Sequence, residues 1–117
     1  MTVKKFVHHS VQNCKIGNHI WDCSRLFHLT KDFEVFEIPL KHLFVDYTYE
    51  HLTLRELAGH MEAVNNADLD YPIILDEDGS IMDGRHRVMK CLINNIETIK
   101  AVRFSENPSP CRYQDDE

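Results

Sequence analysis

In the second half of the chain, two short apolar segments joined by a turn are followed directly by a helix pattern, and this order limits the possible folds more than any other feature. Residues 71–75 are predicted to form a buried strand, and residues 80–82 its antiparallel partner across an acidic turn over 76–79. Gly79 tolerates the positive φ that such a turn needs. A helix over 85–95 follows at once, and its predicted apolar face consists of Val88, Met89, Leu92 and Ile93. A hairpin that leads straight into a helix indicates an α+β fold.

The first half of the chain contains weaker signals for a helix and a strand. Asp22 is a suitable N-cap for a short helix over 21–31, in which Leu26 and Leu29 stand at helical spacing. Residues 35–40 are predicted to form a strand, although a proline interrupts it.

A better-defined helix is predicted to begin after Thr53, because Thr53 and Glu56 form a capping box. Its apolar residues recur at helical intervals and predict one buried face, made of Leu54, Leu57, Ala58, Met61 and Val64. A strand over 98–104 is expected to complete a small mixed sheet with helices packed against it.

A chain of 117 residues is expected to form one domain. We assign residues 1–20 to an N-terminal lead-in, residues 21–104 to the domain, and residues 105–117 to an extended or flexible acidic tail. No apolar run approaches the roughly 18 residues of a membrane span, and the first residues lack the pattern of a signal peptide. We therefore expect a cytoplasmic protein that does not contact membranes.

Charge is distributed unevenly along the chain. The formal net charge is −6, yet the segment 83–103 holds five Lys or Arg residues and only two acidic ones, which gives +3 there and −9 elsewhere. A small basic site on an acidic body suits a compact anion better than a long phosphate backbone, because the acidic surroundings repel flanking phosphates.

The residues at the start of the second predicted helix oppose its dipole. Arg85, His86 and Arg87 fall in the first turn, where peptide N–H groups lack intrahelical partners and each cation costs about 0.3 to 1 kcal/mol. A bound phosphate or carboxylate would reverse the sign of this effect, and Gly84 would let it approach the backbone. The alternative is structural: Asp83 caps the helix and pairs with one of the two arginines.

The cysteines are irregularly spaced and contain no CxxC pair, which favours reduced thiols over disulfides. Cys91 falls on the body of the second helix and is expected to be a small core residue. A zinc site stays open as an alternative for the N-terminal part, although its spacing is not that of a zinc finger; its ligands would be Cys14, His19, Cys23 and His28.

Residues 84–87 form a short motif: a glycine, a variable residue and then His-Arg. This motif lies after the predicted hairpin and before a helix, and Ile-Pro-Leu at 38–40 and the capped helix lie upstream of it. In this combination, residues 21–104 resemble the ParB N-terminal-like and sulfiredoxin superfamily. The chain looks like the short stand-alone bacterial members of that superfamily, which are related to chromosome-partitioning proteins. The resemblance implies a single-domain ParB/sulfiredoxin-like fold.

In that superfamily the motif holds the phosphates of a nucleotide. The resemblance therefore implies binding of a nucleoside triphosphate, ATP or CTP, with Mg²⁺, by the residues Asp83, Gly84, Arg85, His86 and Arg87. The helix after Thr53 corresponds to the segment that lies across the nucleotide, which makes Thr53, Arg55 and His60 candidate flanking residues.

Any catalysis would be slow hydrolysis of the nucleotide or phosphoryl transfer, and whether the protein is an enzyme stays open. Glu56, Asp83 or Asp78 could orient a nucleophile or hold the metal, and no feature of the sequence selects among them. His86, the remaining catalytic candidate, would donate to a phosphate oxygen. Sulfiredoxins carry a nucleophilic cysteine directly before His-Arg, where this chain has Arg85, so sulfinate reduction is not expected. ParB proteins continue into further DNA-binding and dimerisation domains, so we do not expect specific DNA binding by this chain alone.

Two other functions stay open beside nucleotide binding. One is a ParB-like nuclease or nucleic-acid-binding protein, in which the same basic cluster faces a nucleic-acid phosphate; the charge of −9 outside that cluster counts against it. The other is a non-catalytic protein-interaction module that uses the aromatic residues Phe44, Tyr47 and Tyr49. A homodimer and a protein partner are compatible with each of these functions.

Overall fold

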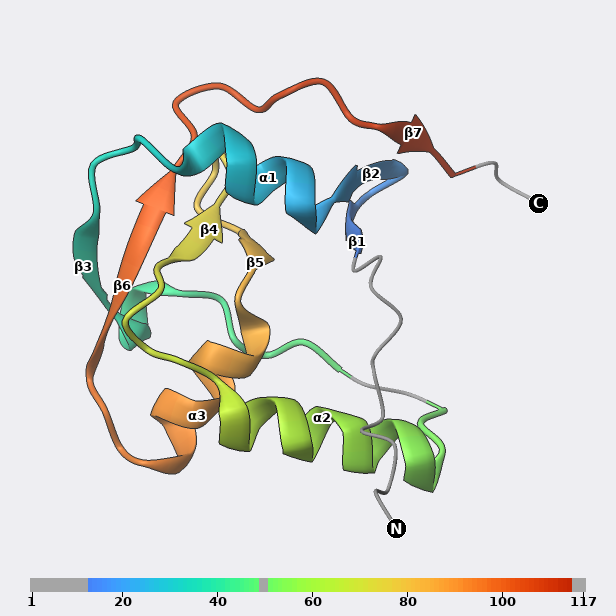
Figure 1. Cartoon of the computed structure of the whole chain (residues 1–117), viewed down its shortest axis with the longest axis vertical. Coiled ribbons are helices and arrows are strands. Elements are labelled where there is room, and N and C mark those ends of the chain that lie inside the picture. The colour runs from blue at the N-terminus through green and yellow to red at the C-terminus, as the bar shows by residue number, and fades with distance from the viewer. Residues whose placement is uncertain (1–12, 49–50, 115–117) are drawn as a thin grey trace, which may run out of the picture.

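The predicted hairpin and helix form the centre of the fold. In the computed structural model, which describes residues 13–48 and 51–114, β4 (Ile73–Leu75) pairs antiparallel with β5 (Ile81–Asp83). Helix α3 (Arg85–Ile93) follows β5 directly (Figure 1). Gly79 has a φ of +86° in the turn, and its N–H donates to the carbonyl of Asp76 at 3.0 Å. The hairpin, its glycine turn and the helix after it are confirmed.

The main sheet is mixed, as predicted for an α+β fold. Strand β6 (Thr98–Arg103) runs parallel to β4 and antiparallel to β3 (Phe36–Pro39), so the strand order is β3-β6-β4-β5. Pro39 is the last residue of β3, an edge strand where a missing N–H is tolerated. A short 3-10 helix, η1 (Leu40–His42), comes next.

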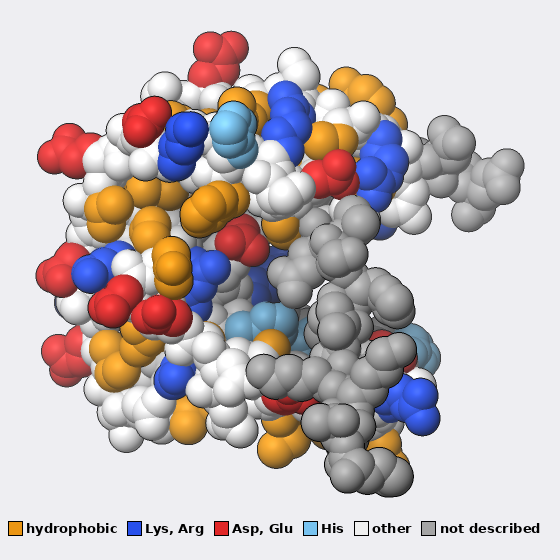
Figure 2. All heavy atoms as spheres, viewed as in Figure 1, with side chains coloured by type: hydrophobic (Ala, Val, Ile, Leu, Met, Phe, Trp, Pro, Cys, Tyr) orange, Lys and Arg blue, Asp and Glu red, His pale blue; other side chains and the backbone are white. Residues whose placement is uncertain are grey.

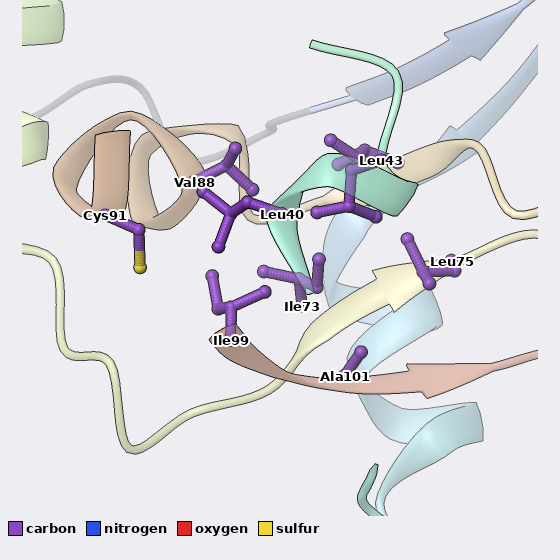
Figure 3. Close-up of a cluster of buried hydrophobic side chains, with 9 residues drawn as sticks. Leu40, Leu43, Ile73, Leu75, Val88, Cys91, Ile99 and Ala101 are labelled. Carbon is purple, nitrogen blue, oxygen red and sulfur yellow. The ribbon is translucent and has the colours of Figure 1, made fainter. Parts of the chain in front are cut away.

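The described residues form two clusters of buried hydrophobic side chains, and the one beside the hairpin and helix lies between this sheet, α3 and η1 (Figure 3). Its buried residues are Leu40, Leu43, Ile73, Leu75, Ile81, Val88, Cys91, Ile99 and Ala101. Helix α3 contributes Val88 and Cys91, one turn apart on the face toward the sheet. The predicted face was partly wrong, since Leu92 and Ile93 are 47% and 67% exposed. Cys91 is a core residue, as predicted, and burial raises the pKa of its thiol.

A second, smaller sheet was not predicted. Strand β1 (Asn13–Ile16) pairs with β2 (His19–Asp22), which in turn pairs with β7 (Arg112–Tyr113). The described part of the predicted lead-in is thus a hairpin. Most of the predicted tail is described, and it folds back onto β2 as an extended segment, where Pro108 accepts a hydrogen bond from the buried indole N–H of Trp21 at 2.9 Å.

Helix α1 (Cys23–Thr30) begins after Asp22, the predicted N-cap residue. The Asp22 side chain makes no capping hydrogen bond and instead pairs with Arg112 of β7 at 3.2 Å. Leu26 is fully buried beneath the helix, whereas Leu29 is 40% exposed. In Figure 1, α1 lies at the upper end of β4 and β5, and α3 and α2 lie at their lower end.

Helix α2 (Leu54–Asn66) has the predicted cap, since Thr53 Oγ1 accepts the N–H of Glu56 at 3.1 Å. The predicted buried face of this helix was wrong. Only Val64 of that stripe is buried, together with Gly59, because the helix meets the rest of the chain through a different side. Across the described residues, no helix combines the length and the apolar character that crossing a membrane requires.

Candidate functional site

The candidate site is the junction between β5 and α3, where Gly84 occupies the N-cap position. Its φ is +104°, a conformation that side chains rarely adopt. A Cβ atom at this position would lie 2.5 Å from Cγ2 of Ile73, a core residue of β4. The backbone therefore packs directly on the sheet at the helix start, and only glycine allows both the conformation and the contact.

The first turn of α3 contains no acidic residue, and no side chain caps it. Arg85, His86 and Arg87 occupy this turn, at the end of the helix where the dipole is positive. Asp83 directly precedes Gly84 but does not cap the helix. In Figure 2, basic, acidic and histidine side chains meet in a hollow near the middle of the molecule, beside this junction.

Arg87 is held by its own chain. Its guanidinium donates to the carbonyl of Pro72 at 2.6 Å and to that of Tyr71 at 3.4 Å, and it pairs with Asp83 Oδ2 at 3.3 Å. The pairing of Asp83 with an arginine, one of the two interpretations of this cluster, is thus present. Arg87 therefore links the start of α3 to Tyr71 and Pro72, which directly precede β4.

Arg85 is placed differently. Its guanidinium carbon lies 4.4 Å from the centroid of the Tyr47 ring, a cation–π contact. Arg85 also lines a hollow of about 50 Å³ whose other walls are apolar, namely Val45, Tyr47, Ile81, Val88, Met89 and Leu92. Within the described residues no carboxylate pairs with Arg85. The ring fixes the plane of the guanidinium, and its N–H groups can still donate to an anion.

His60 and His86 are brought together from two helices. Nδ1 of His60 lies 2.7 Å from Nε2 of His86, so one of these nitrogens carries the proton and donates to the other. The two ring centroids are 5.0 Å apart. The contact places a predicted flanking residue of α2 beside a predicted phosphate-binding residue of α3, and it links the two helices at the candidate site.

The other predicted flanking and catalytic residues lie farther from the helix start. Thr53 and Glu56 bind each other at the first turn of α2, and Thr53 Oγ1 donates to Glu56 Oε1 at 3.2 Å. Arg55 is exposed and lies five residues, or about 140° of helix rotation, from His60. Asp78 is in the hairpin turn, at the opposite end of β5 from Gly84.

Two cysteines near the site were not predicted to be there. Burial raises the pKa of Cys14 to about 11, and the nearby Arg85 charge opposes that rise. Burial also raises the pKa of Cys23 to about 12, with contributions from the charge and a hydrogen bond of Asp83. Both thiols therefore remain protonated at neutral pH and are poor nucleophiles. The Gly17-Asn18 dipeptide, a hairpin turn signal, could have placed Cys14 on a strand.

The zinc alternative finds no support in the described residues, where no three His, Cys, Asp or Glu side chains are grouped to hold a metal ion. The His19 ring instead packs edge-on against Trp21 and Tyr113. Mg²⁺ binds through one or two carboxylates together with phosphate oxygens and water. Asp83, the carboxylate next to the helix start, is already bound by Arg87, so Mg²⁺ fits here only when it is carried by the phosphates and water.

Tyr47 was predicted only as part of an aromatic interaction surface with Phe44 and Tyr49. Its ring packs edge-on against Phe44 at 4.9 Å, and Phe44 is 59% exposed, whereas Tyr49 lies outside the described residues. The role of Tyr47 as the platform for Arg85 has no signal in the local sequence. No family model matches this chain, and no curated protein or solved structure matches it either.

Proposed function

We propose that this protein binds a nucleoside triphosphate, ATP or CTP, whose phosphates lie at the N-terminus of α3. The observation that carries the proposal is an uncapped helix start with three basic or potentially basic residues and no acid in its first turn. Arg85 pairs with no described carboxylate, so its charge at this positive helix end costs stability in the empty protein and becomes favourable when an anion binds. The glycine contact with Ile73 keeps the helix start in place.

The residues of the junction have different roles in the proposed site. Arg85, stacked on Tyr47 and unpaired with any described carboxylate, supplies the charge and the donor N–H groups for the phosphates. Arg87 and Asp83 hold the helix start in position. The contact between His60 and His86 joins α2 to the first turn of α3 beside these residues.

We expect the phosphates of the nucleotide to bind at the helix start and its base to lie near the protein surface. The hollow beside Arg85, at about 50 Å³, is far below the roughly 300 Å³ of pockets that enclose a drug-sized ligand, so it does not enclose a nucleotide. The acidic remainder of the chain disfavours a long phosphate backbone. Mg²⁺ bound to the phosphates would supply charge neutralisation. Hydrolysis or phosphoryl transfer would need a base in addition, and Asp83 is already engaged by Arg87.

A thermal-shift panel tests the proposal, with ATP, CTP, GTP, ADP and inorganic phosphate, each with Mg²⁺. A ligand at about 100 times its dissociation constant adds roughly 2.7 kcal/mol of stability, which corresponds to several degrees in Tm for a domain of this size. Arg85→Ala should abolish the shift. Lys100→Ala, which removes an exposed cation paired only loosely with Asp70 at 3.8 Å, should retain it. Equal losses in the two variants would indicate diffuse charge rather than a site, and no shift with any ligand would refute the proposal.

A further inference from the structure

A hollow of about 220 Å³ opens between the C-terminal part of α1 and the main sheet. Its walls come from α1, from the segment that connects α1 to β3, and from β4 and β6 together with the two residues that precede β4. Figure 2 shows hydrophobic side chains gathered over this part of the molecule, to the left of its centre. We call it the α1 hollow; its lining includes Phe27, Lys31, Phe33, Val35, Tyr71 and Ile74.

The α1 hollow lies on the opposite face of the main sheet from α3. Successive side chains of a strand point to opposite faces of its sheet. Ile73 of β4 packs in the cluster that contains Val88 of α3, whereas Ile74 packs in the cluster that contains Leu26 of α1. Because Ile74 lines the α1 hollow, this hollow is distinct from the proposed nucleotide site at the start of α3.

The walls of the α1 hollow expose large apolar side chains to solvent. Phe27, Val35 and Tyr71 are 57%, 49% and 54% exposed. The Phe33 ring packs edge-on against Phe104, with ring centroids 5.2 Å apart, and this contact fixes one wall. A ligand with an apolar body would release water from these walls. A cavity of about 150 Å³ accepts benzene, so the α1 hollow has room for one aromatic ring with a short substituent.

Lys31 is the charged residue among those that line the α1 hollow. It forms no ion pair with any other residue that the structure describes. The hydroxyl of Thr30, also in the lining, already donates to the carbonyl of Leu26 at 2.9 Å. The neighbouring carboxylates of Asp32 and Glu34 do not line the hollow. The charge at the hollow is therefore positive, which favours an anionic group on a ligand over a cationic one.

We propose that the α1 hollow binds a small aromatic carboxylate, of which phenylacetate is the simplest probe. Its ring lies among Phe27, Val35 and Tyr71, and its carboxylate lies beside the ammonium group of Lys31. The apolar walls select the ring, the volume limits the ligand to about one ring, and the lysine selects the negative charge. Because such a ligand is small and Lys31 is exposed, we expect a dissociation constant of about 0.1 to 1 mM.

Titration of the full chain with phenylacetate, followed by amide ¹H–¹⁵N NMR spectra at neutral pH, tests the proposal. The largest changes should occur at residues 27–35 and 73–75 and should saturate as one site. Phenylacetamide has the same shape without the charge and should bind about fivefold more weakly, and the cation phenethylamine should bind more weakly still. No saturating change up to about 10 mM phenylacetate, changes confined to other residues, or equal affinity for the three compounds would overturn the proposal.

Two variants test the lysine and the hollow separately. Lys31→Gln should weaken phenylacetate binding about fivefold and leave phenylacetamide binding unchanged, whereas Lys41→Gln, at an exposed lysine of η1 outside the hollow, should bind like wild type. Val35→Trp should fill the hollow and weaken binding at least about tenfold with an unchanged circular dichroism spectrum. Leu54→Trp, at an exposed position on α2, is its control.

Wild-type affinity for phenylacetate in either Lys31→Gln or Val35→Trp would contradict the assignment. Lys31 is exposed, so its variant keeps the proposal testable even where the larger side chain at residue 35 disturbs folding. No nucleotide enters these experiments, and their outcome is therefore independent of the proposed nucleotide site.

Discussion

The Cβ atom that Gly84 lacks would lie 2.5 Å from Cγ2 of Ile73, so the start of α3 touches β4, an inner strand of the main sheet, through its backbone. This contact sets the distance between the helix start and the sheet. Any side chain at residue 84 must move α3 away from β4 and displace the first-turn residues that we assign to phosphate binding.

Gly84→Ala should lower the free energy of unfolding by about 3 kcal/mol, because it combines an unfavourable φ with overpacking. Gly17→Ala is a matched control, since Gly17 has a φ of +61° but no atom within 4 Å of the added Cβ. The control should lose only about 1 kcal/mol. Urea unfolding of both variants measures the difference, and equal losses would show that the Ile73 contact is unimportant.

The two arginines of the first turn should respond in opposite ways to removal. Arg87→Ala loses hydrogen bonds to two backbone carbonyls and an ion pair to Asp83, so we expect a loss of about 1 to 3 kcal/mol in stability. Arg85→Ala removes a cation from the positive end of the helix and should leave stability unchanged or slightly higher. Thermal unfolding without ligand distinguishes them, and a large loss for Arg85→Ala would assign that residue a structural role.

Stability should fall as the pH rises above 9. The thiol pKa values of Cys14 and Cys23 are raised by burial from 9.0 to about 11 and about 12. Between pH 9 and those values the unfolded chain releases protons that the folded chain retains, so the free energy of unfolding decreases there. Below pH 9 neither thiol changes the stability.

Thermal unfolding at pH 7, 9 and 10.5, a series of about one to two units per step, measures this dependence. Cys14→Ala and Cys23→Ala should each show a smaller decrease between pH 9 and 10.5 than the wild-type protein. Cys111→Ala is the control, because Cys111 is exposed. A decrease that is the same in all four proteins would assign it to other groups.

The elements that could be predicted from the sequence depend on neighbours close along the chain. The turn at Gly79, the cap at Thr53 and the helix after Gly84 are each determined by a few adjacent residues, and each is confirmed. Strand β7 could not be predicted in this way, because it pairs with a strand about 90 residues earlier in the chain. The hairpin of β1 and β2 had a local signal in Gly17-Asn18 that was missed.

The error in α2 has a different physical cause. Helical periodicity shows that Leu54, Leu57 and Met61 share a face, but it does not show what that face contacts. The helix packs through Gly59 and Val64 instead, and a glycine does not appear as part of an apolar stripe. The same limit applies at the site, where sequence treats Arg85 and Arg87 alike and tertiary contacts with Tyr47 and Asp83 distinguish them.

Amide ¹H–¹⁵N NMR spectra recorded during titration with the nucleotide and Mg²⁺ would show whether an anion binds at the start of α3. We expect the largest changes at the amides of residues 84–87, because peptide N–H groups at a helix start contact a bound phosphate. The Arg85→Ala variant should show smaller changes at the same amides. Changes confined to other parts of the chain, or none at saturating nucleotide, would contradict the assignment of this site.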